Sequence, residues 1–283
     1  MRGGAGDPER DPVALICMEW RPTILAAMRT HGQSVQDQFD AQAHAYLTSP
    51  VHAEGPDLAH AKNLVGHAAL GTGHAIDVGC GAGHLSFALA PGLARVVALD
   101  PSPSMLATVE KAAAVRGLPN IETRQASAES LPFAGSSFDL ACTRYSAHHW
   151  TRLESALQEM HHVLRLRGRL LIIDVLGHEE PLVDTHLQSM ELLRDPSHVR
   201  NRSATEWRSL LEAAGFVDVE HAQWPLRLTF AAWVERMRTS PERTSIIRAL
   251  QNEAPREVQE ALAFEPDGSF AVRTGLFWAR RAD

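Results

Sequence analysis

The sequence predicts an α/β protein built on a doubly wound, mostly parallel sheet. From residue 74 onward, short apolar runs alternate with segments of helical composition, which is typical of parallel sheets with helices on both faces. The first apolar run ends in three closely spaced glycines, and the run Arg169–Leu176 is almost continuously apolar, as expected of a strand buried on both sides.

Two helices are expected before the sheet, at Val35–Leu47 and Asp57–Leu70. The 4, 3 spacing of Phe39, Ala43 and Tyr46 places these residues on one face of the first helix. Seven strands follow from the apolar runs. They are expected at His74–Gly79, Arg95–Leu99, Asn120–Arg124, Phe138–Thr143, Arg169–Leu176, Phe216–Glu220 and within Ser269–Arg280.

The helices between the strands carry recognisable start and stop signals. Ser102 precedes Pro103 and can cap a helix that Gly117 ends. Thr151–Glu154 reads as a capping box that opens a helix running to about residue 166, and Ser203–Glu206 reads as a second capping box, with a helix that stops at residue 215. A further short helix is expected at residues 84–89.

The chain is expected to form one domain over residues 34–283, with a helical cap. The segments 177–202 and 226–264 are long for connections within such a sheet and have helical apolar patterns, so we place both in the cap. Residues 1–33 are rich in glycine, arginine and proline and show no sustained period. We predict that they are a poorly ordered or mis-assigned leader.

Composition excludes several classes of protein. Of the 283 residues, 45% are hydrophobic and 22% are charged, which is ordinary for a globular chain. The net charge of −7 does not favour a nucleic-acid partner. The three cysteines are far apart and form no CxxC pair, which argues against a disulfide framework or a structural zinc site. No apolar run reaches the roughly 18 residues of a membrane helix, so we expect a cytoplasmic protein without a membrane partner.

The segment Asp77-Val-Gly-Cys-Gly-Ala-Gly83 is the strongest chemical signal. Glycines at a strand-to-helix turn let the backbone approach a ligand and take positive φ. The segment lacks the G-x-G-x-x-G/A spacing of a dinucleotide loop and the G-K-[ST] of a phosphate loop. Asp100 ends the next strand, 21 residues after Gly79, where a carboxylate can accept hydrogen bonds from both ribose hydroxyls of a nucleoside.

The spacing D-x-G-x-G-x-G resembles motif I of the class I S-adenosylmethionine-dependent methyltransferases. The run Phe39–Tyr46 resembles that family's segment closing over the cofactor, and Gln125–Phe133 resembles its adenine-binding segment. Together they look like the menaquinone/ubiquinone-biosynthesis type. The runs Arg144–Trp150 and Asp195–Asn201 resemble those of an uncharacterised bacterial member of this family, and this resemblance does not identify a substrate.

The resemblance implies a Rossmann-like, seven-stranded mixed sheet in the order 3-2-1-4-5-7-6, with S-adenosylmethionine as cofactor. It also implies which residues hold that cofactor. Ala128 would meet the adenine edge, Met105 its face, and Ser127 stands where many members carry an aspartate. The full set of expected cofactor-binding residues is Tyr46, Asp77, Gly79, Gly81, Asp100, Met105, Ser127, Ala128 and Arg144.

A methyl acceptor is expected at the carboxyl end of the fourth strand. His149 and His148 lie there, and a histidine is a suitable general base near neutral pH. Tyr145 and Trp150 are candidates for an aromatic wall against a planar acceptor. In the cap, His198 and Arg200 are candidates for binding an acidic or phenolate acceptor. No metal site is expected, because no ligand spacing such as HExxH appears.

These residues predict methyl transfer from S-adenosylmethionine to a small, planar organic acceptor at carbon, oxygen or nitrogen. Two alternatives stay open. A nucleic-acid methyltransferase is disfavoured because Thr143–Ser146 stands where an N/D-P-P-Y-type motif would be, and because no basic cluster is present. A non-catalytic cofactor-binding protein is the other. The acceptor, the atom methylated and the oligomeric state do not follow from the sequence.

Overall fold

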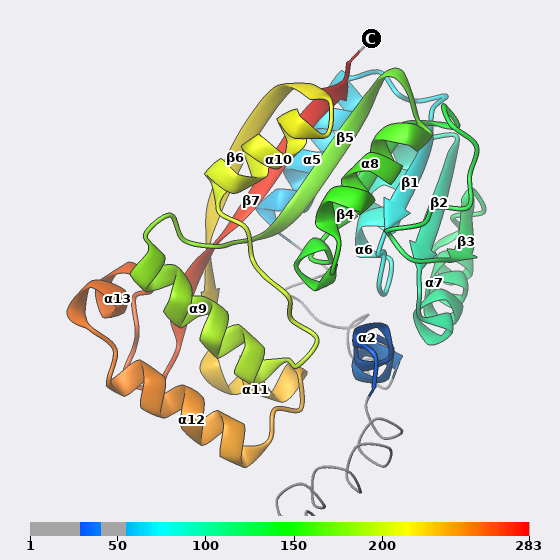
Figure 1. The fold of residues 1–283 in the computed structure, drawn as a ribbon. Coiled ribbons are helices and arrows are strands. Elements are labelled where there is room, and N and C mark those ends of the chain that lie inside the picture. Colours follow the sequence, from blue (N-terminus) through cyan, green and yellow to red (C-terminus); the bar gives the residue numbers. More distant parts are fainter. Residues whose placement is uncertain (1–28, 41–54, 283) are drawn as a thin grey trace, which may run out of the picture.

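The computed structural model describes residues 29–40 and 55–282 of the chain. Its centre is a seven-stranded sheet in the order β3-β2-β1-β4-β5-β7-β6, as predicted (Figure 1). The pairs β1–β2, β1–β4, β2–β3 and β4–β5 are parallel, and β7 runs antiparallel to both β5 and β6. The strands are β1 (His74–Val78), β2 (Arg95–Asp100), β3 (Ile121–Gln125), β4 (Phe138–Arg144), β5 (Leu164–Leu176), β6 (Phe216–Leu228) and β7 (Phe270–Arg281).

Helices cover both faces of this sheet, which is why the central strands are apolar on both sides. On one face, α8 (Leu153–Val163) and α10 (Ala204–Ala213) pack against alternate residues of β1, β2 and β5. On the other face, α5 (Pro56–His67) and α6 (His84–Leu89) pack against the intervening residues of the strands, whose side chains point to that side. The helix α7 (Pro103–Arg116) begins at the Ser102 cap and ends at Gly117, as predicted.

The cap has a hydrophobic core of its own. The helices α9 (Pro181–Arg194), α11 (Phe230–Arg236), α12 (Pro241–Asn252) and α13 (Arg256–Ala261) enclose it together with the far ends of β6 and β7. The helix α2 (His31–Asp40) lies beside this group, near the ends of the central strands (Figure 1). The cap therefore stands at the edge of the sheet where ligands of such folds bind.

Several element boundaries differ from those predicted. The strand β6 continues to Leu228, so the second cap segment begins at α11 and not at residue 226. The strand β5 begins at Leu164, inside the expected helix, because Leu164 is buried against Phe138 at an irregularity in the β4–β5 pairing. The Thr151 capping box is wrong: Arg152 is the N-cap of α8, and the Thr151 hydroxyl bonds to Glu129 instead.

The helix α2 begins at His31, four residues before the predicted Val35, so its first turn falls within the expected 1–33 leader. Residues 1–28 and the predicted end of that helix, residues 41–47, lie outside the described residues.

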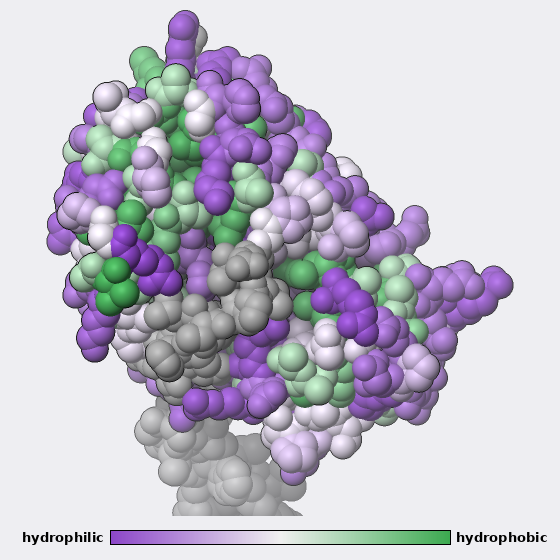
Figure 2. Space-filling model, turned by 180° about the vertical axis from the view of Figure 1, so that it is seen from behind, coloured by the Kyte–Doolittle hydropathy of each residue, from purple (hydrophilic) through white to green (hydrophobic). Residues whose placement is uncertain are grey.

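The face turned away in Figure 1 is mostly hydrophilic around its rim, with smaller groups of hydrophobic residues between (Figure 2). Large hydrophobic side chains that are exposed are scattered over separate elements. They include Val115, Leu166, Leu182, Leu192 and Ile246. No helix among residues 29–40 and 55–282 is both long and apolar enough to cross a membrane.

The second predicted capping box is confirmed at the start of α10. The Ser203 hydroxyl accepts a hydrogen bond from the Glu206 amide, and the Glu206 carboxylate accepts one from the Ser203 amide. Ser203→Ala should lower the free energy of unfolding by about 1 kcal/mol, since an N-cap side chain contributes roughly that amount. Urea unfolding would measure it, with Ser209→Ala on the exposed face of α10 as the control; equal stability of the two variants would contradict the assignment.

Candidate active site

The glycine loop between β1 and α6 is held in place by the end of β2. The amides of Gly79 and Cys80 both donate to the carbonyl of Leu99, at 2.7 and 2.9 Å. The Gly81 amide donates to Oδ2 of Asp100 at 2.9 Å, and the Ser102 amide donates to Oδ1 of the same carboxylate at 2.9 Å. Asp100 thus fixes both the loop and the start of α7.

Glycine is required in this loop for two different reasons. Gly79 and Gly81 have φ angles of +69° and +51°, in the left-handed region that side chains disfavour. A Cβ atom at Gly79 would lie 2.0 Å from the Ser146 hydroxyl, so packing also demands glycine there. At Gly81 a Cβ atom would meet no described atom within 4 Å and would enter open space. That space is available to a ligand.

A cavity of about 280 Å³ lies over this loop, and we call it the loop cavity. It collects residues from β1, β2, β4 and α2, as expected where the carboxyl ends of parallel strands meet. The predicted residues that line it are Asp77, Gly79, Gly81, Asp100, Met105, Ser127, Ala128, Arg144, Tyr145, His149 and Trp150. Tyr46, also predicted here, lies outside the described residues.

The walls of the loop cavity differ in character. Met105 packs with Ala82 and Phe39 and forms an apolar side. The Ser127 hydroxyl bonds to Glu129, which lines the cavity beside it and was not predicted. The Asp77 carboxyl is buried; Ser86 donates to its Oδ2 at 2.6 Å, while Oδ1 has no hydrogen-bond partner in the described part of the chain.

Burial raises the pKa of Asp77 to about 6, against the opposing effect of the Ser86 hydrogen bond. A negative charge is therefore costly at this position unless a cation or further donor is brought close to the carboxylate. The structure thus provides a partly unsatisfied carboxyl group at the floor of the loop cavity, where a positively charged ligand group would be favoured.

Arg144 and Tyr145 form the end of β4. The Arg144 Nε donates to Oδ2 of Asp57 at 2.5 Å in an ion pair that is 5% exposed on each side, and the guanidinium lies over the Tyr145 ring. Tyr145 has φ of +53°, a conformation that bulky residues rarely adopt. Burial raises the pKa of Tyr145 to about 12, so its phenol stays protonated. Its hydroxyl bonds to Thr274.

A second, smaller cavity of about 80 Å³ lies between the end of the sheet and the cap, and we call it the cap cavity. It shares Phe39, Tyr145 and His149 with the loop cavity. Its remaining wall combines aromatic, aliphatic and charged residues of β5, α9, β6 and α11 and of the turns next to them. They include His148, Glu191, Arg194, Asp195, Leu228 and Trp233.

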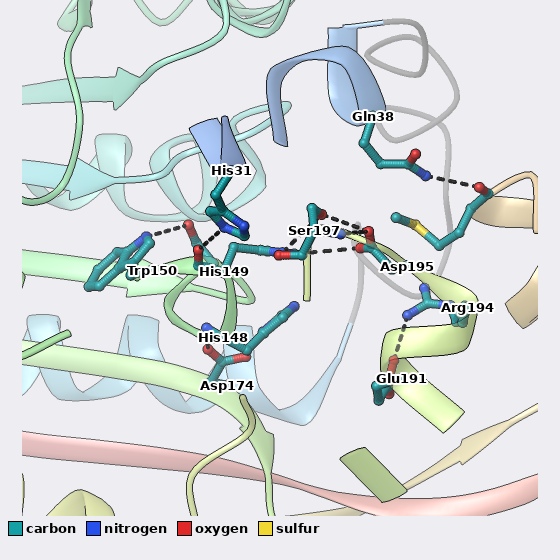
Figure 3. A network of polar contacts seen from close by, with 12 residues as sticks. His31, Gln38, His148, His149, Trp150, Asp174, Glu191, Arg194, Asp195 and Ser197 are labelled. Carbon is teal, nitrogen blue, oxygen red and sulfur yellow. Dashed lines mark hydrogen bonds and ion pairs between the residues drawn. The ribbon is translucent and has the colours of Figure 1, made fainter. Parts of the chain in front are cut away.

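His149 lines both cavities, and its surroundings define its protonation. Nδ1 lies 3.0 Å from the carbonyl of Ser197 and must donate to it, which leaves the lone pair on Nε2 (Figure 3). Nε2 lies 4.0 Å from Oδ2 of Asp195. Burial and the neighbouring His148 lower the pKa of His149 to about 4. The ring is therefore neutral near pH 7 and is able to accept a proton.

His148 lines only the cap cavity and is set differently from His149. Its Nδ1 lies 2.6 Å from Oδ1 of Asp174, and its backbone amide donates to Oδ2 of the same carboxylate (Figure 3). Burial alone would lower the pKa of His148, but the charge and hydrogen bond of Asp174 outweigh it and raise the pKa. His148 is thus the imidazole of the pair that favours the charged form.

Two predicted acceptor-binding residues are not placed at either cavity. His198 is buried behind His148, and its Nε2 is paired with the Gln188 side chain at 2.9 Å. Burial and the two neighbouring histidines lower the pKa of His198 to about 2. Arg200 is half exposed and pairs with Asp184 and Glu206. His198 is thus held within the cap, and Arg200 links the cap to α10. Trp150 lines the loop cavity but not the cap cavity, and its indole N–H donates to the Ser146 hydroxyl.

The sequence analysis missed the residues that hold the histidines. Asp174 interrupts the otherwise apolar run of residues 170–176 in β5, and that lone carboxylate was an available signal. Asp195 and Ser197 lie in a run noted only as a resemblance. The Ser197 amide and hydroxyl both donate to Oδ1 of Asp195, at 2.8 and 2.6 Å. Across the described residues, no group of three or more histidine, cysteine or acidic side chains is arranged to hold a metal ion.

Comparison with known proteins agrees with this arrangement. A family model described as a methyltransferase domain matches residues 76–172. The chain is 43% identical over 188 residues to the uncharacterised protein YafE of Escherichia coli, covering 66% of this chain and 91% of YafE. It is 32% identical over 223 residues to the uncharacterised methyltransferase YcgJ of Bacillus subtilis, covering 78% of this chain and 87% of YcgJ.

Solved structures show the same fold. The crystal structure of YcgJ superposes with a TM-score of 0.74 at 29% identity, covering 80% of this chain and 99% of that one. A putative methyltransferase from Bacillus halodurans gives a TM-score of 0.77 at 29% identity, covering 81% and 100%. The seven-stranded sheet and its glycine loop thus define an α/β protein with a Rossmann-like fold, and the chain belongs to the class I S-adenosylmethionine-dependent methyltransferases.

Gly81→Ala should weaken binding of S-adenosylhomocysteine by at least about tenfold, because its methyl group would project into the loop cavity. Gly117→Ala is the matched control: Gly117 also has positive φ and open space, but it ends α7 away from both cavities. Both variants should lose similar stability in thermal unfolding, of about 1 kcal/mol. Unchanged affinity in Gly81→Ala would show that no ligand approaches the loop there.

The depressed pKa of His149 predicts a pH-dependent stability. The contribution of His149 to the free energy of unfolding is complete above pH 6.5 and is lost as the pH falls from 6.5 towards 4. The reason is that the imidazole of the unfolded chain binds a proton in this range and that of the folded chain does not. Between pH 7.5 and 5, wild type should lose on the order of 2 kcal/mol more unfolding free energy than His149→Gln. Urea unfolding at both pH values measures this, with His186→Gln, on α9 and outside both cavities, as control. An equal pH effect in wild type and His149→Gln would contradict it.

Proposed function

We propose that this chain binds S-adenosylmethionine in the loop cavity and transfers its methyl group to a small organic acceptor held in the cap cavity. One observation carries the proposal. Asp100 fixes the glycine loop beneath the loop cavity, and the space next to Gly81 is not filled by any described side chain. The cap cavity shares His149 and Tyr145 with the loop cavity, so an acceptor bound there would lie next to the cofactor.

The residues around the loop cavity suit this cofactor. Asp100 stands at the end of β2 and lines the loop cavity, and its carboxylate oxygens are hydrogen-bond acceptors. It is suited to accept hydrogen bonds from ribose hydroxyls. Met105 and Phe39 offer an apolar surface to an adenine ring. The buried Asp77 carboxyl, partly unsatisfied, favours a cationic group such as an amino-acid ammonium.

The bound cofactor supplies an activated methyl group and a good leaving group, so the protein's task is to position the acceptor and manage its proton. Placing two reactants in line contributes up to about 7–11 kcal/mol to lowering the barrier. His149 holds its Nε2 lone pair at the wall between the cavities and is suited to receive a proton from the acceptor. Asp174 fixes the neighbouring residue His148 through its backbone amide and its Nδ1.

A small acceptor is favoured over a nucleic acid by two observations. The net charge is −7, and the cap cavity measures only about 80 Å³. Phe39, Tyr145 and Trp233 give it aromatic walls that suit a planar molecule.

Titration calorimetry with S-adenosylhomocysteine is the direct test, with NADH as the control ligand. Micromolar binding of the first and none of the second is expected. Asp100→Ala should weaken the binding by about tenfold to a hundredfold, since each hydrogen bond to a charged group contributes roughly 1.5–3 kcal/mol.

The matched control is Glu122→Ala, which removes a carboxylate from β3 that is paired with Arg95 and lines neither cavity. It should bind S-adenosylhomocysteine as wild type does. Absence of binding to wild type would overturn the proposed function, and unchanged affinity in Asp100→Ala would remove Asp100 from the site.

A further inference from the structure

Two hydrogen-bond acceptors face each other at the boundary of the two cavities. Nε2 of His149 carries a lone pair because Nδ1 donates to the Ser197 carbonyl. Oδ2 of Asp195 lies 4.0 Å away (Figure 3). The other carboxylate oxygen, Oδ1, already accepts from the Ser197 amide and hydroxyl. Neither Nε2 nor Oδ2 receives a hydrogen bond from the residues that the structure describes.

The separation of these acceptors restricts what can bind between them. An atom placed about 2.9 Å from each would see them at an angle of about 90°. The two hydrogens of an amino group diverge by only slightly more, so both hydrogen bonds would be bent by about 10°. One nitrogen carrying two hydrogens therefore satisfies both acceptors at once.

Other acceptor atoms fit this pair poorly. A hydroxyl group has one hydrogen, so it would satisfy His149 and turn a lone pair towards the Asp195 carboxylate. A phenolate or carboxylate has none and would be repelled. An alkylammonium, with a pKa near the 10.4 of lysine, has no lone pair to methylate. His149, with a pKa of about 4, is too weak a base to deprotonate it.

From this geometry we infer that the methyl acceptor is a neutral primary amine on an aromatic ring, held by His149 and Asp195. The inference rests on the proposed function and specifies its substrate class. An arylamine keeps its lone pair near neutral pH. The cap cavity is smaller than the roughly 150 Å³ that holds benzene, so it takes the amino group, and the ring contacts Phe39 and Tyr145, which line both cavities.

The proton balance of the transfer follows from the same contacts. The nitrogen lone pair forms the new N–C bond as the C–S bond of the sulfonium breaks and its electron pair stays on sulfur. The methylated nitrogen is then cationic and keeps two hydrogens, one of them bonded to Nε2 of His149. His149 takes that proton, which leaves a neutral secondary amine, and the Asp195 carboxylate stabilises the imidazolium.

The product has one N–H left and satisfies only one of the two acceptors. The secondary amine should therefore bind more weakly than the primary amine, and a single methylation should be favoured over two. This preference for a single methylation follows from the presence of two acceptors, and a site with one acceptor would not show it.

The test compares four probes that share a benzene ring and differ in their polar groups. Each is added to the full chain saturated with S-adenosylhomocysteine. Calorimetry would measure the affinities of aniline, phenol, catechol and N-methylaniline. Aniline is expected to bind about tenfold or more tightly than phenol and N-methylaniline, since each loses a hydrogen bond to one acceptor. The inference is overturned if phenol or catechol binds as tightly as aniline, or if none of the four binds.

Asp195→Asn turns one acceptor into a donor. Its amide oxygen can keep the hydrogen bonds from Ser197, which places the amide NH₂ where Oδ2 was. Aniline affinity should fall about tenfold, whereas phenol affinity should hold or rise because the new donor suits a hydroxyl oxygen. Glu191→Gln is the matched control, because that cap-cavity carboxylate is paired with Arg194 and both probes should respond equally. A parallel fall for aniline and phenol in Asp195→Asn would overturn the inference.

Turnover separates this inference from the proposed function. With S-adenosylmethionine present, monomethylated aniline should accumulate, and N-methylaniline should be a poor acceptor. Failure of wild type to bind S-adenosylhomocysteine would defeat the proposed function itself. Methylation of phenol or catechol in preference to aniline would leave that function intact and defeat only the choice of an amine.

Discussion

The carboxylate of Asp100 is the interaction on which the geometry of the loop cavity depends. Its two oxygens tie the Gly81 amide and the Ser102 amide to the end of β2. The glycine loop and the N-terminus of α7 therefore keep a fixed separation. Because Leu99 also accepts from the amides of Gly79 and Cys80, the shape of the loop follows directly from the register of β1 against β2, in which Val78 pairs with Leu99.

A second constraint is electrostatic and lies at the end of β4. The rings of His148 and His149 have centroids 4.2 Å apart, and His198 lies 5.8 Å from His148. Charging all three in a buried space would be prohibitive. Asp174 selects His148 for the charged form, and the charge favoured there helps keep His149 and His198 neutral. Burial is the larger cause of the lowered pKa of His149 and His198, and the charge that Asp174 favours on His148 adds to it.

The sequence was sufficient for the parts of the structure that depend on local pattern. The alternation of apolar runs and helices predicted the α/β class, the sheet order followed from resemblance, and the Ser102 and Ser203 caps were found from their spacing. The Thr151 box failed because its hydroxyl has a partner elsewhere, in Glu129. Local spacing cannot reveal such a competing contact, and it cannot reveal how far β6 extends when β7 continues beside it.

The same distinction applies to the candidate site. Residues of the glycine loop and of the ends of β2 and β4 could be placed because parallel strands bring their carboxyl ends together. His198 and Arg200 lie away from both cavities and are held by other residues: Gln188 for the first, Asp184 and Glu206 for the second. The pairing of Asp174 with His148 joins residues 26 apart, and only the β4–β5 register brings them into contact.

The two cavities are built from different parts of the chain, and this division explains why family membership does not identify the acceptor. Apart from those of α2, the described residues that line the loop cavity lie within residues 76–172, the part that the methyltransferase model matches. Asp195 and Trp233, by contrast, belong to the cap. His149 stands at the junction, since the matched segment supplies its ring and the cap supplies the Ser197 carbonyl that fixes its lone pair. Changes in the cap residues can therefore alter the cap cavity without altering the glycine loop, because the two cavities share only Phe39, Tyr145 and His149 among their described lining residues, and none of these lies in the loop.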